Sequence, residues 1–420
     1  MCHASAMVSC ESSHTPVTPV ATPQVGIFVN APSSANSLLA PFGLHNFPYL
    51  PSVGILSTYA PTACGLATFS AALAGSLSAR GVEVNVVRIS DGSRSTRADV
   101  MGELVNGSAA SVAAVATLLS RYDVAIIQHE YGIYGGQDGD EVIEVMRALT
   151  VPSIVVLHTV LNSPTPHQRS VLEEVVARAD QVVVMSETAH RRLADGFAVD
   201  RRKISTIPHG ATLPTTAAFK RSHRPIILSW GLLGPGKGIE RVIDAMPSLK
   251  NLAQQPRYVI AGRTHPKVFA AQGDVYREAL IAQADRLGVV DSVSFDSTYR
   301  TPKALTELMQ TASVVVLPYD STDQVTSGVL VDSIASGRPI VATAFPHAVE
   351  LLGSGAGTLV AHDDPAALVS ALRRLLTDPR VAGTMASEAR ELAPAMAWPV
   401  VANSYIGLAQ GLVAARRASA

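Results

Sequence analysis

Cysteine is scarce in this sequence of 420 residues, which contains only Cys2, Cys10 and Cys64. Three thiols without a C-x-x-C pair argue against a disulfide framework and against a cysteine-based zinc site. A reducing compartment, the cytoplasm, is therefore the expected location. An excess of charge of one sign is also lacking, because the formal net charge is -1. No long-range field then attracts nucleic acid, and no nucleic-acid partner is expected.

Long hydrophobic runs are missing as well, although 47% of the residues are hydrophobic. No apolar run reaches the roughly 18 residues that a membrane-spanning helix needs. Runs such as Val151–Leu161 and Val182–Met185 end at strand length, and they predict buried parallel strands. The first residues show no basic segment followed by an apolar one, so no secretory signal is indicated.

Strands and helices alternate after an amino-terminal segment, residues 1–50, that is rich in Ala, Ser, Pro and Thr and is predicted to be a flexible arm. A hinge is expected at Pro208-His209-Gly210, followed by a second alternating series. Strands are predicted at Val53–Ser57, Val84–Ile89, Val124–Gln128, Ser153–Leu157, Gln181–Met185, Lys203–Ile207, Ile226–Trp230, Tyr258–Ala261, Val293–Phe295, Val314–Leu317, Ile340–Thr343 and Thr358–Val360. Helices are predicted at Leu66–Ala79, Glu141–Leu149, Gln168–Ala179, Glu187–Phe197, Ile239–Leu249, Val275–Leu287, Pro302–Thr311, Gly328–Ser336, Pro365–Leu376 and Trp398–Ala414.

This alternation predicts an α/β protein made of two doubly wound, Rossmann-like domains with parallel sheets. We place the first domain at residues 51–212 and the second at residues 213–397, with residues 398–420 returning to the first. In such sheets the ligand lies at the carboxyl ends of the strands, here facing the crevice between the domains.

The strongest local signal is the segment QVTSGVLVDSIASGRPIV at residues 324–341. Thr326, Ser327 and Gly328 open a helix, and the free N–H groups of such a helix start favour a phosphate. Asp332 lies one turn further along the same face, where its carboxylate can accept hydrogen bonds from a ribose diol. From spacing alone, an ordinary capped helix with a solvated Asp332 is an equally good interpretation.

The same segment resembles the carboxyl-terminal signature of the retaining glycosyltransferases of family 4, which have the GT-B fold. In that family two acidic residues stand eight apart before an Ala-Ser-Gly-x-Pro turn. The resemblance implies that Asp332 holds the nucleotide ribose and that Gln324 contacts the transferred sugar. Gln324 replaces the usual Glu; an amide can still form hydrogen bonds, but it cannot stabilise a developing positive charge. The backbone groups implied to bind the diphosphate belong to Ser327, Gly328, Val329 and Leu330.

A second signal is the glycine-rich turn GLLGPGKG at residues 231–238, directly after a predicted strand. It is similar to the family's diphosphate-binding loop, which implies that Lys237 neutralises the diphosphate. The family's arginine position holds Leu232, and Arg263 at the end of the next strand is a candidate replacement. A surface ion pair is an equally good interpretation of Arg263.

Further candidates come from the first half. The turn PTACGLATF at residues 61–69 resembles the family's glycine loop over the donor phosphates, through Gly65. Within that turn, Cys64 is interpreted as a small buried residue rather than a reactive thiol. His129 and His158 end adjacent predicted strands; the resemblance places His158 near the donor sugar, whereas His129 and Glu130 are assigned to the acceptor side. For Glu130, a loop-fixing carboxylate remains an open alternative.

The resemblance covers residues 53–411, including a crossing helix that begins near Trp398. It implies transfer of a hexose, from GDP-mannose as a first guess or from another GDP- or UDP-linked sugar, to a carbohydrate or glycolipid hydroxyl with retention of configuration. His158, Gln324 and Lys237 are the expected catalytic residues. No cofactor or metal is expected, because no H-E-x-x-H or D-x-D pattern stands in the cleft positions. For Arg416 and Arg417 a solvated helix end is favoured over weak contact with a membrane surface.

Three alternatives compete with this interpretation. A related GT-B phosphorylase or sugar-nucleotide epimerase is kept open by the departures at Leu232 and Gln324. A non-catalytic protein that binds a nucleotide sugar is kept open by the same positions. An NAD(P)-dependent oxidoreductase is disfavoured, because residues 58–65 lack the G-x-G-x-x-G triplet.

Overall fold

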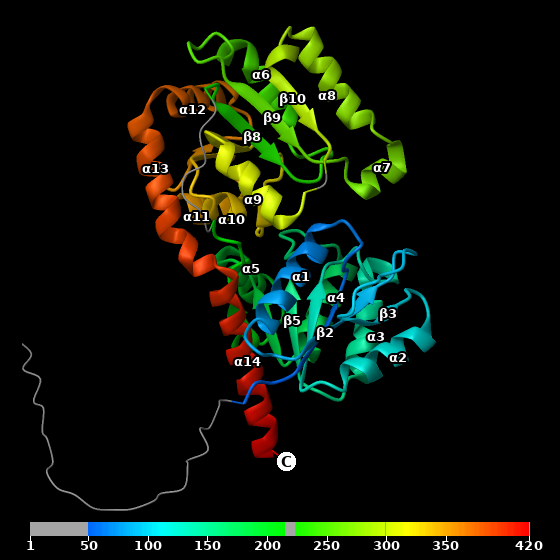
Figure 1. Ribbon diagram of the computed structural model, residues 1–420. Coiled ribbons are helices and arrows are strands. Elements are labelled where there is room, and N and C mark those ends of the chain that lie inside the picture. The colour runs from blue at the N-terminus through cyan, green and yellow to red at the C-terminus, as the bar shows by residue number, and fades with distance from the viewer. Residues whose placement is uncertain (1–48, 215–222, 299, 420) are drawn as a thin grey trace, which may run out of the picture. The chain divides into compact units, whose positions relative to one another are not determined.

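The computed structural model describes residues 49–214, 223–298 and 300–419. The predicted amino-terminal arm therefore lies outside the described residues, apart from Tyr49 and Leu50. Two parallel sheets organise the rest, one of seven strands and one of six. We call the part built on the first sheet the first lobe and the part built on the second sheet the second lobe (Figure 1).

The first lobe has strand order β3-β2-β1-β4-β5-β6-β7, and all its neighbouring strands run parallel. Its strands are β1 (Val53–Ser57), β2 (Val84–Ile89), β3 (Val100–Leu104), β4 (Val124–His129), β5 (Ser153–Leu157), β6 (Gln181–Val184) and β7 (Ile204–Thr206). Its helices are α1 (Gly65–Ser78), α2 (Ala109–Leu119), α3 (Glu141–Ala148), α4 (Pro166–Arg178) and α5 (Glu187–Gly196), with 3-10 turns η1 (Gln137–Gly139) and η2 (Arg201–Lys203).

The second lobe repeats this plan with strand order β10-β9-β8-β11-β12-β13, again parallel throughout. Its strands are β8 (Ile226–Trp230), β9 (Arg257–Ala261), β10 (Val293–Asp296), β11 (Val314–Leu317), β12 (Ile340–Thr343) and β13 (Thr358–Val360). Its helices are α6 (Ile239–Leu249), α7 (Pro266–Gln272), α8 (Val275–Arg286), α9 (Pro302–Thr311), α10 (Gly328–Ala335), α11 (Pro346–Leu352), α12 (Pro365–Thr377) and α13 (Pro379–Leu392), with 3-10 turns η3 (Val290–Ser292) and η4 (Ala393–Met396). The chain ends in α14 (Trp398–Ser419).

Helices cover both faces of each sheet, which explains the continuous apolar strands of the sequence. In the first lobe, α1 and α14 pack on one face, and α2, α3, α4 and α5 pack on the other (Figure 1). In the second lobe, α6, α8 and α12 pack on one face, and α9, α10 and α11 pack on the other. Every residue of β1, β5, β11 and β12 is consequently buried.

Two chain crossings connect the lobes and lie side by side. Ala211 N donates to Met396 O at 2.7 Å, and Trp398 N donates to Ala211 O at 3.1 Å. Helix α14 then packs on the first lobe through Trp398, Val401 and Tyr405, among others. The predicted return of the carboxyl-terminal helix to the first domain is therefore seen in the structure. No helix among the described residues is long and apolar enough to span a bilayer.

Each sheet has a point at which the strand order reverses, between β1 and β4 and between β8 and β11. Adjacent crossovers leave in opposite directions there, so a crevice opens at the carboxyl ends of these strands. The loops that follow β1 and β8 are the two glycine-rich turns that the sequence analysis selected, and the loop that follows β11 carries Gln324. The fold thus brings the predicted ligand-binding loops to the two reversal points.

The predicted fold class is confirmed, but five elements were missed: β3, α2, α7, α11 and α13. β3 is a half-buried edge strand with Gly102 and Glu103 at its centre, so it lacks an apolar run. α7 and α11 have seven residues each, too few to display a helical period. α2 is so rich in Ala and Val that it shows no polar face, and α13 buries only Met385, Ala386 and Ala389.

Candidate active site

Helix α10 begins with a side-chain cap. Ser327 caps the helix, with its Oγ accepting from Leu330 N at 3.2 Å. Ser327 N donates to His347 Nδ1 at 2.9 Å. The N–H groups of Ser327 and Leu330 are thus already used, whereas no described residue accepts from the N–H groups of Gly328 and Val329. Of the backbone N–H groups predicted to bind phosphate, only those of Gly328 and Val329 are therefore still available as donors among the described residues.

This helix start lies against the first lobe. A methyl group on Gly328 would lie 2.7 Å from His209 Nε2, in the chain segment that follows β7. In the loop before α10, Val325 is buried in the core of the first lobe, and its carbonyl accepts from Ser186 Oγ at 2.7 Å. Arg192 of α5 forms an ion pair with Asp323 at 2.6 Å. The loop that carries Gln324 is therefore held by contacts with both lobes.

Lys237 lies in the glycine-rich turn after β8. Its Nζ is 4.5 Å from the centre of the Tyr319 ring, and no ion pair of Lys237 is found among the described residues. Burial lowers the pKa of its ammonium group, because the charged form is desolvated. The adjacent Gly238 has a φ of 61°, and a methyl group there would strike the carbonyl of Pro318 at 1.8 Å. Only glycine lets the turn pack this closely and present Lys237 beside the end of β11.

Asp332 follows one turn later in α10 and is half-buried. No described group donates a hydrogen bond to its carboxylate, and burial raises its pKa from 3.8 to about 7. A carboxylate that is desolvated without a partner is costly in the free protein and is stabilised by a ligand that donates to it. The predicted ribose contact of Asp332 stays a prediction, and a ribose would supply the hydrogen-bond donors that this carboxylate lacks among the described residues.

Gln324 is turned towards its own loop. Its Nε2 donates to Thr326 O at 2.9 Å, and the hydroxyl of Thr326 is buried without a partner among the described residues. The structure thus shows a local hydrogen bond for Gln324, and its predicted contact with the transferred sugar stays a prediction.

The first lobe contributes a wall of neutral rings. His158 Nε2 lies 2.7 Å from Gln128 Oε1, and the Phe69 ring packs edge-on against both His158 and His209, with 5.0 Å between ring centres in each pair. Burial is the main reason why the pKa of His158 falls to about 3 and that of His209 to about 4. Both imidazoles are therefore uncharged at neutral pH.

The acceptor-side assignment of His129 needs correction. Its side chain is completely buried, both ring nitrogens lack a partner among the described residues, and burial lowers its pKa to about 4. A ring enclosed on all sides does not contact an acceptor. Glu130, the next residue, accepts from Gly132 N at 2.6 Å. That bond supports the loop-fixing alternative that the sequence left open.

The remaining candidates lie at the surface. A methyl group on Gly65, the first residue of α1, would meet no atom within 4 Å, so the space above this turn is open. Cys64 caps α1 through its sulfur and is half-buried. Arg263 is exposed, and its carbonyl accepts from Leu233 N at 2.9 Å. The proposed roles of Gly65 and Arg263 remain predictions.

Sequence reasoning missed four side chains that the fold brings to this site: Gln128, His209, Tyr319 and His347. His209 follows β7, Tyr319 follows β11 and His347 follows β12, just as His158 follows β5. The signal that could have found them is therefore positional, because polar or aromatic residues after buried parallel strands gather at one sheet edge.

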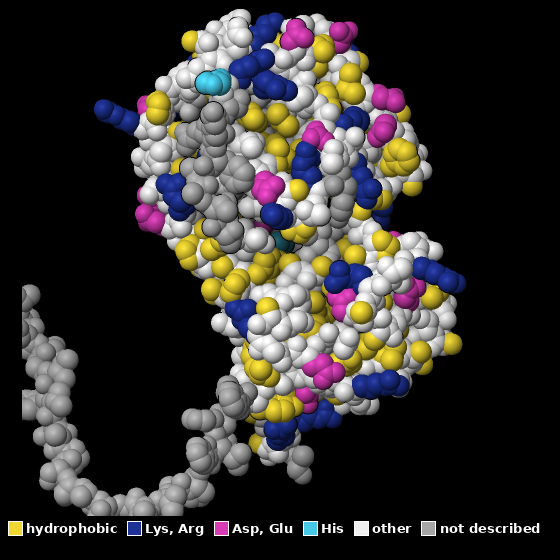
Figure 2. All heavy atoms as spheres, in the orientation of Figure 1, with side chains coloured by type: hydrophobic (Ala, Val, Ile, Leu, Met, Phe, Trp, Pro, Cys, Tyr) yellow, Lys and Arg dark blue, Asp and Glu magenta, His cyan; other side chains and the backbone are white. Residues whose placement is uncertain are grey.

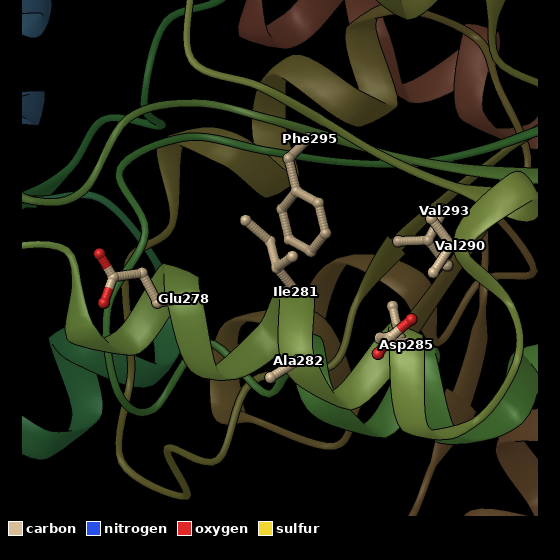
Figure 3. Close-up of a pocket in the computed structure, with 8 residues that line it drawn as sticks. Glu278, Ile281, Ala282, Asp285, Val290, Val293 and Phe295 are labelled. Atoms are coloured by element: carbon tan, nitrogen blue, oxygen red, sulfur yellow. The ribbon is translucent and has the colours of Figure 1, made fainter.

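Two cavities lie elsewhere in the second lobe. One, of about 410 Å³, runs along the edge strand β10, where Ile281 of α8 faces Phe295 and the carboxylates of Glu278 and Asp285 lie to either side (Figure 3). The other, of about 820 Å³, lies at the carboxyl end of α10, around Ser336 and Arg338. Because the candidate site uses the opposite end of α10, neither cavity belongs to it.

On the face shown in Figure 2, basic and acidic side chains are interspersed. Among the residues with described positions, no group of three or more His, Cys, Asp or Glu side chains could hold a metal ion.

Two family descriptions match the two lobes in chain order. Residues 63–213 match Glycosyltransferase Family 4, and residues 216–392 match Glycosyl transferases group 1. The chain belongs to the family 4 type of GT-B glycosyltransferases. This confirms the resemblance seen in the motifs around Lys237 and Asp332.

Curated relatives agree with this family. A D-inositol 3-phosphate glycosyltransferase of Acidothermus cellulolyticus is 29% identical over 275 residues, which cover 61% of this chain and 59% of the relative. The protein of the same name from Stackebrandtia nassauensis is 27% identical over 291 residues, covering 65% and 64%. The matches thus span less than two thirds of the length of these relatives.

Solved structures share the fold. Anabaena HepE in complex with UDP superposes with a TM-score of 0.69 at 18% identity, covering 86% of this chain and all of the other. A glycosyltransferase from Rickettsia africae gives a TM-score of 0.69 at 12% identity, covering 87% and 99%. The GT-B architecture expected from the sequence is therefore confirmed.

Proposed function

We propose that this chain transfers a hexose from a nucleoside-diphosphate sugar to a hydroxyl group, with retention of configuration and without a metal ion. The observation that supports this proposal is that the glycine-rich turn lies beside α10, since a methyl group on Gly231 would lie 3.7 Å from Val329 Cγ2. Three groups on these two elements have no hydrogen-bond or ion-pair partner among the described residues. These are the ammonium of Lys237, the N–H groups of Gly328 and Val329, and the carboxylate of Asp332. Together they match an anionic diphosphate joined to a ribose diol.

In this proposal the second lobe binds the donor nucleotide. The ribose donates hydrogen bonds to Asp332, which relieves the desolvation of that carboxylate. The diphosphate lies between Lys237 and the start of α10, where preorganised donors stabilise the charge that develops as the sugar leaves. A protein cation in this place supports the proposal that no metal is needed.

The first lobe shields the transferred sugar. Neutral His158, held by Gln128, presents a fixed ring to the sugar without bringing a second charge. We propose that the acceptor hydroxyl attacks from the face that the diphosphate leaves, through an oxocarbenium-like state. The uncharged wall supports this route, since it excludes water that would otherwise hydrolyse the donor.

The donor is proposed to be a UDP- or GDP-hexose. HepE was crystallised with UDP and with UDP-glucose, which makes UDP-glucose the first donor to test beside GDP-mannose. The acceptor is proposed to be a hydroxyl on a carbohydrate, glycolipid or polyol phosphate. The last class is supported by the curated relatives, which are D-inositol 3-phosphate glycosyltransferases.

Calorimetry with UDP and GDP, followed by transfer assays with the matching sugars, tests this function. Asp332→Ala should weaken binding of the preferred nucleotide by about 2 kcal/mol, the cost of losing hydrogen bonds to a charged group. Nuclear magnetic resonance of the product should show the anomeric configuration of the donor. An inverted product would refute the retaining route. Binding without turnover on any acceptor would favour a non-catalytic protein, and phosphate-dependent release of sugar 1-phosphate would favour a phosphorylase.

A further inference from the structure

The family's second diphosphate cation is missing at Leu232, and the structure shows what lies beside that position. Leu233 N donates to Arg263 O at 2.9 Å, and His265 N donates to Leu233 O at 2.8 Å. These two bonds form a short parallel bridge between the glycine-rich turn and the segment 263–267. Side chains from this segment are therefore carried on the flank of the turn that presents Lys237.

Helix α7 is packed directly on the same turn. A methyl group on Gly234 would lie 3.1 Å from Val268 Cγ2, so little space separates the turn from the helix. Lys267 N donates to His265 Nδ1 at 3.1 Å. Because Nδ1 accepts this bond, the neutral imidazole carries its proton on Nε2 and offers an N–H donor there.

Two lysine ammonium groups act electrostatically on this imidazole. Burial, and then the charges of Lys267 and Lys237, lower the pKa of His265. His265 is therefore neutral at pH 7, and the positive charge beside it comes from the two lysines. No ion pair of Lys237 or Lys267 is found in the described part of the chain.

Lys267 also reaches the first lobe. Its Nζ donates to Gly132 O at 3.1 Å, in the loop that Glu130 holds. A carbonyl oxygen does not neutralise an ammonium group, so this lysine still has its full charge available for an anion. The contact positions Nζ on the border between the glycine-rich turn and the loop after β4.

We propose that Lys267 Nζ and His265 Nε2–H bind the donor diphosphate together with Lys237, and so replace the arginine that is missing at Leu232. The inference rests on the proposed function and identifies which residues complete the diphosphate site. The ammonium group of Lys267 supplies one positive charge, and the imidazole N–H of His265 supplies one neutral hydrogen-bond donor. A single guanidinium would provide both the charge and the additional donor.

Calorimetry on the full-length chain with UDP, GDP, UMP and GMP tests this assignment. Lys267→Met should raise the Kd of the preferred diphosphate about tenfold, as expected for loss of a charge-assisted contact. The Kd of the matching monophosphate should change by less than about threefold. Lys267→Arg should restore binding of the diphosphate, and His265→Ala should weaken it about threefold.

Lys303→Met is the matched control, because Lys303 is an exposed lysine of α9 whose Nζ lies 4.0 Å from Glu307. Unchanged diphosphate binding in Lys267→Met would overturn the inference while leaving the proposed function intact. Equal weakening of diphosphate and monophosphate would also overturn it, since that pattern indicates a structural role through Gly132. Failure of the unaltered chain to bind either UDP or GDP would overturn both proposals. Thermal unfolding of each variant without nucleotide establishes that it is folded.

Discussion

The two walls of the candidate site are made by equivalent parts of the two lobes, yet they differ in charge. The second-lobe wall carries Lys237 and Asp332, both partly desolvated and neither paired in the described structure. The first-lobe wall carries His158 and His209, both neutral and both packed on Phe69. The same architecture therefore builds one face suited to an anionic nucleotide and one suited to an uncharged sugar.

The difference arises in the loops and not in the sheets. Both walls lie at the carboxyl ends of buried parallel strands, where side chains of successive loops converge. On the second lobe the loop after β8 is rich in glycine, so backbone and Lys237 can approach a ligand closely. On the first lobe the corresponding positions hold rings that fill space and pack edge-on against Phe69. Three experiments test this difference between the two walls.

Removing charge from the second wall should have the largest effect. We expect Lys237→Met to raise the Kd of UDP or GDP about 100-fold, because a desolvated cation loses its diphosphate partner. The opposite-wall variant His158→Gln should leave that Kd within about threefold and instead lower kcat. Calorimetry and steady-state kinetics measure the two effects. Similar losses of nucleotide affinity in both variants would mean that both walls contribute to nucleotide binding, contrary to the proposed division.

Forcing the walls apart should have the next largest effect. In Gly328→Ala the new methyl group would lie 2.7 Å from His209 Nε2, well inside contact distance. We expect kcat to fall about 30-fold, because sub-ångström displacements of reacting groups are costly. Gly383→Ala in α13 is the control, since no atom lies within 4 Å of its new methyl group. The double variant Gly328→Ala with His209→Ala should recover activity, and failure to do so would show that the clash is not the cause.

The pH dependence of binding should give the smallest of the three effects. Burial raises the pKa of Asp332 to about 7, and a ribose diol donates to the ionised form. The Kd of the nucleotide should therefore fall about tenfold between pH 6 and pH 8, as the carboxylate ionises. The same raised pKa lowers the free energy of unfolding of the free protein as pH rises from about 4 to 7. Over that range the folded state still holds a proton on Asp332 that the unfolded state has released. Asp332→Asn should bind with a flatter pH profile, and an equally steep profile in this variant would exclude Asp332 as the titrating group.

Strand prediction succeeded where an apolar run is bounded by polar or turn residues. The predicted limits of β1, β8, β11 and β12 equal the observed ones. It failed at β3, an edge strand whose residues are mostly half-buried. An edge strand has only one neighbouring strand and is partly exposed. Fewer of its side chains need to be apolar, so it lacks the continuous apolar run that identifies a buried strand.

Prediction of the site residues likewise succeeded for residues in local sequence motifs and failed for residues placed by tertiary contacts. Lys237, Ser327 and Asp332 belong to local motifs, and each was selected from the sequence. His209 was interpreted as part of a hinge, although it contacts Gly328 across 119 positions of the chain. His129 was assigned to the acceptor side, but the strand containing it turns the ring into the core. Side-chain direction at a strand end depends on twist and packing, which a single sequence does not display.

The sequence by itself determined the parallel α/β plan, the two glycine-rich turns and the capped start of α10, because these depend on local chain geometry and on the burial of continuous apolar strands. Tertiary structure alone decided which N–H groups remain open among the described residues, which histidines lie at the strand ends, and that the segment 263–267 lies beside the glycine-rich turn. Those features depend on contacts between residues far apart in the chain, and the free energy of such contacts is set by the packing of whole elements against one another.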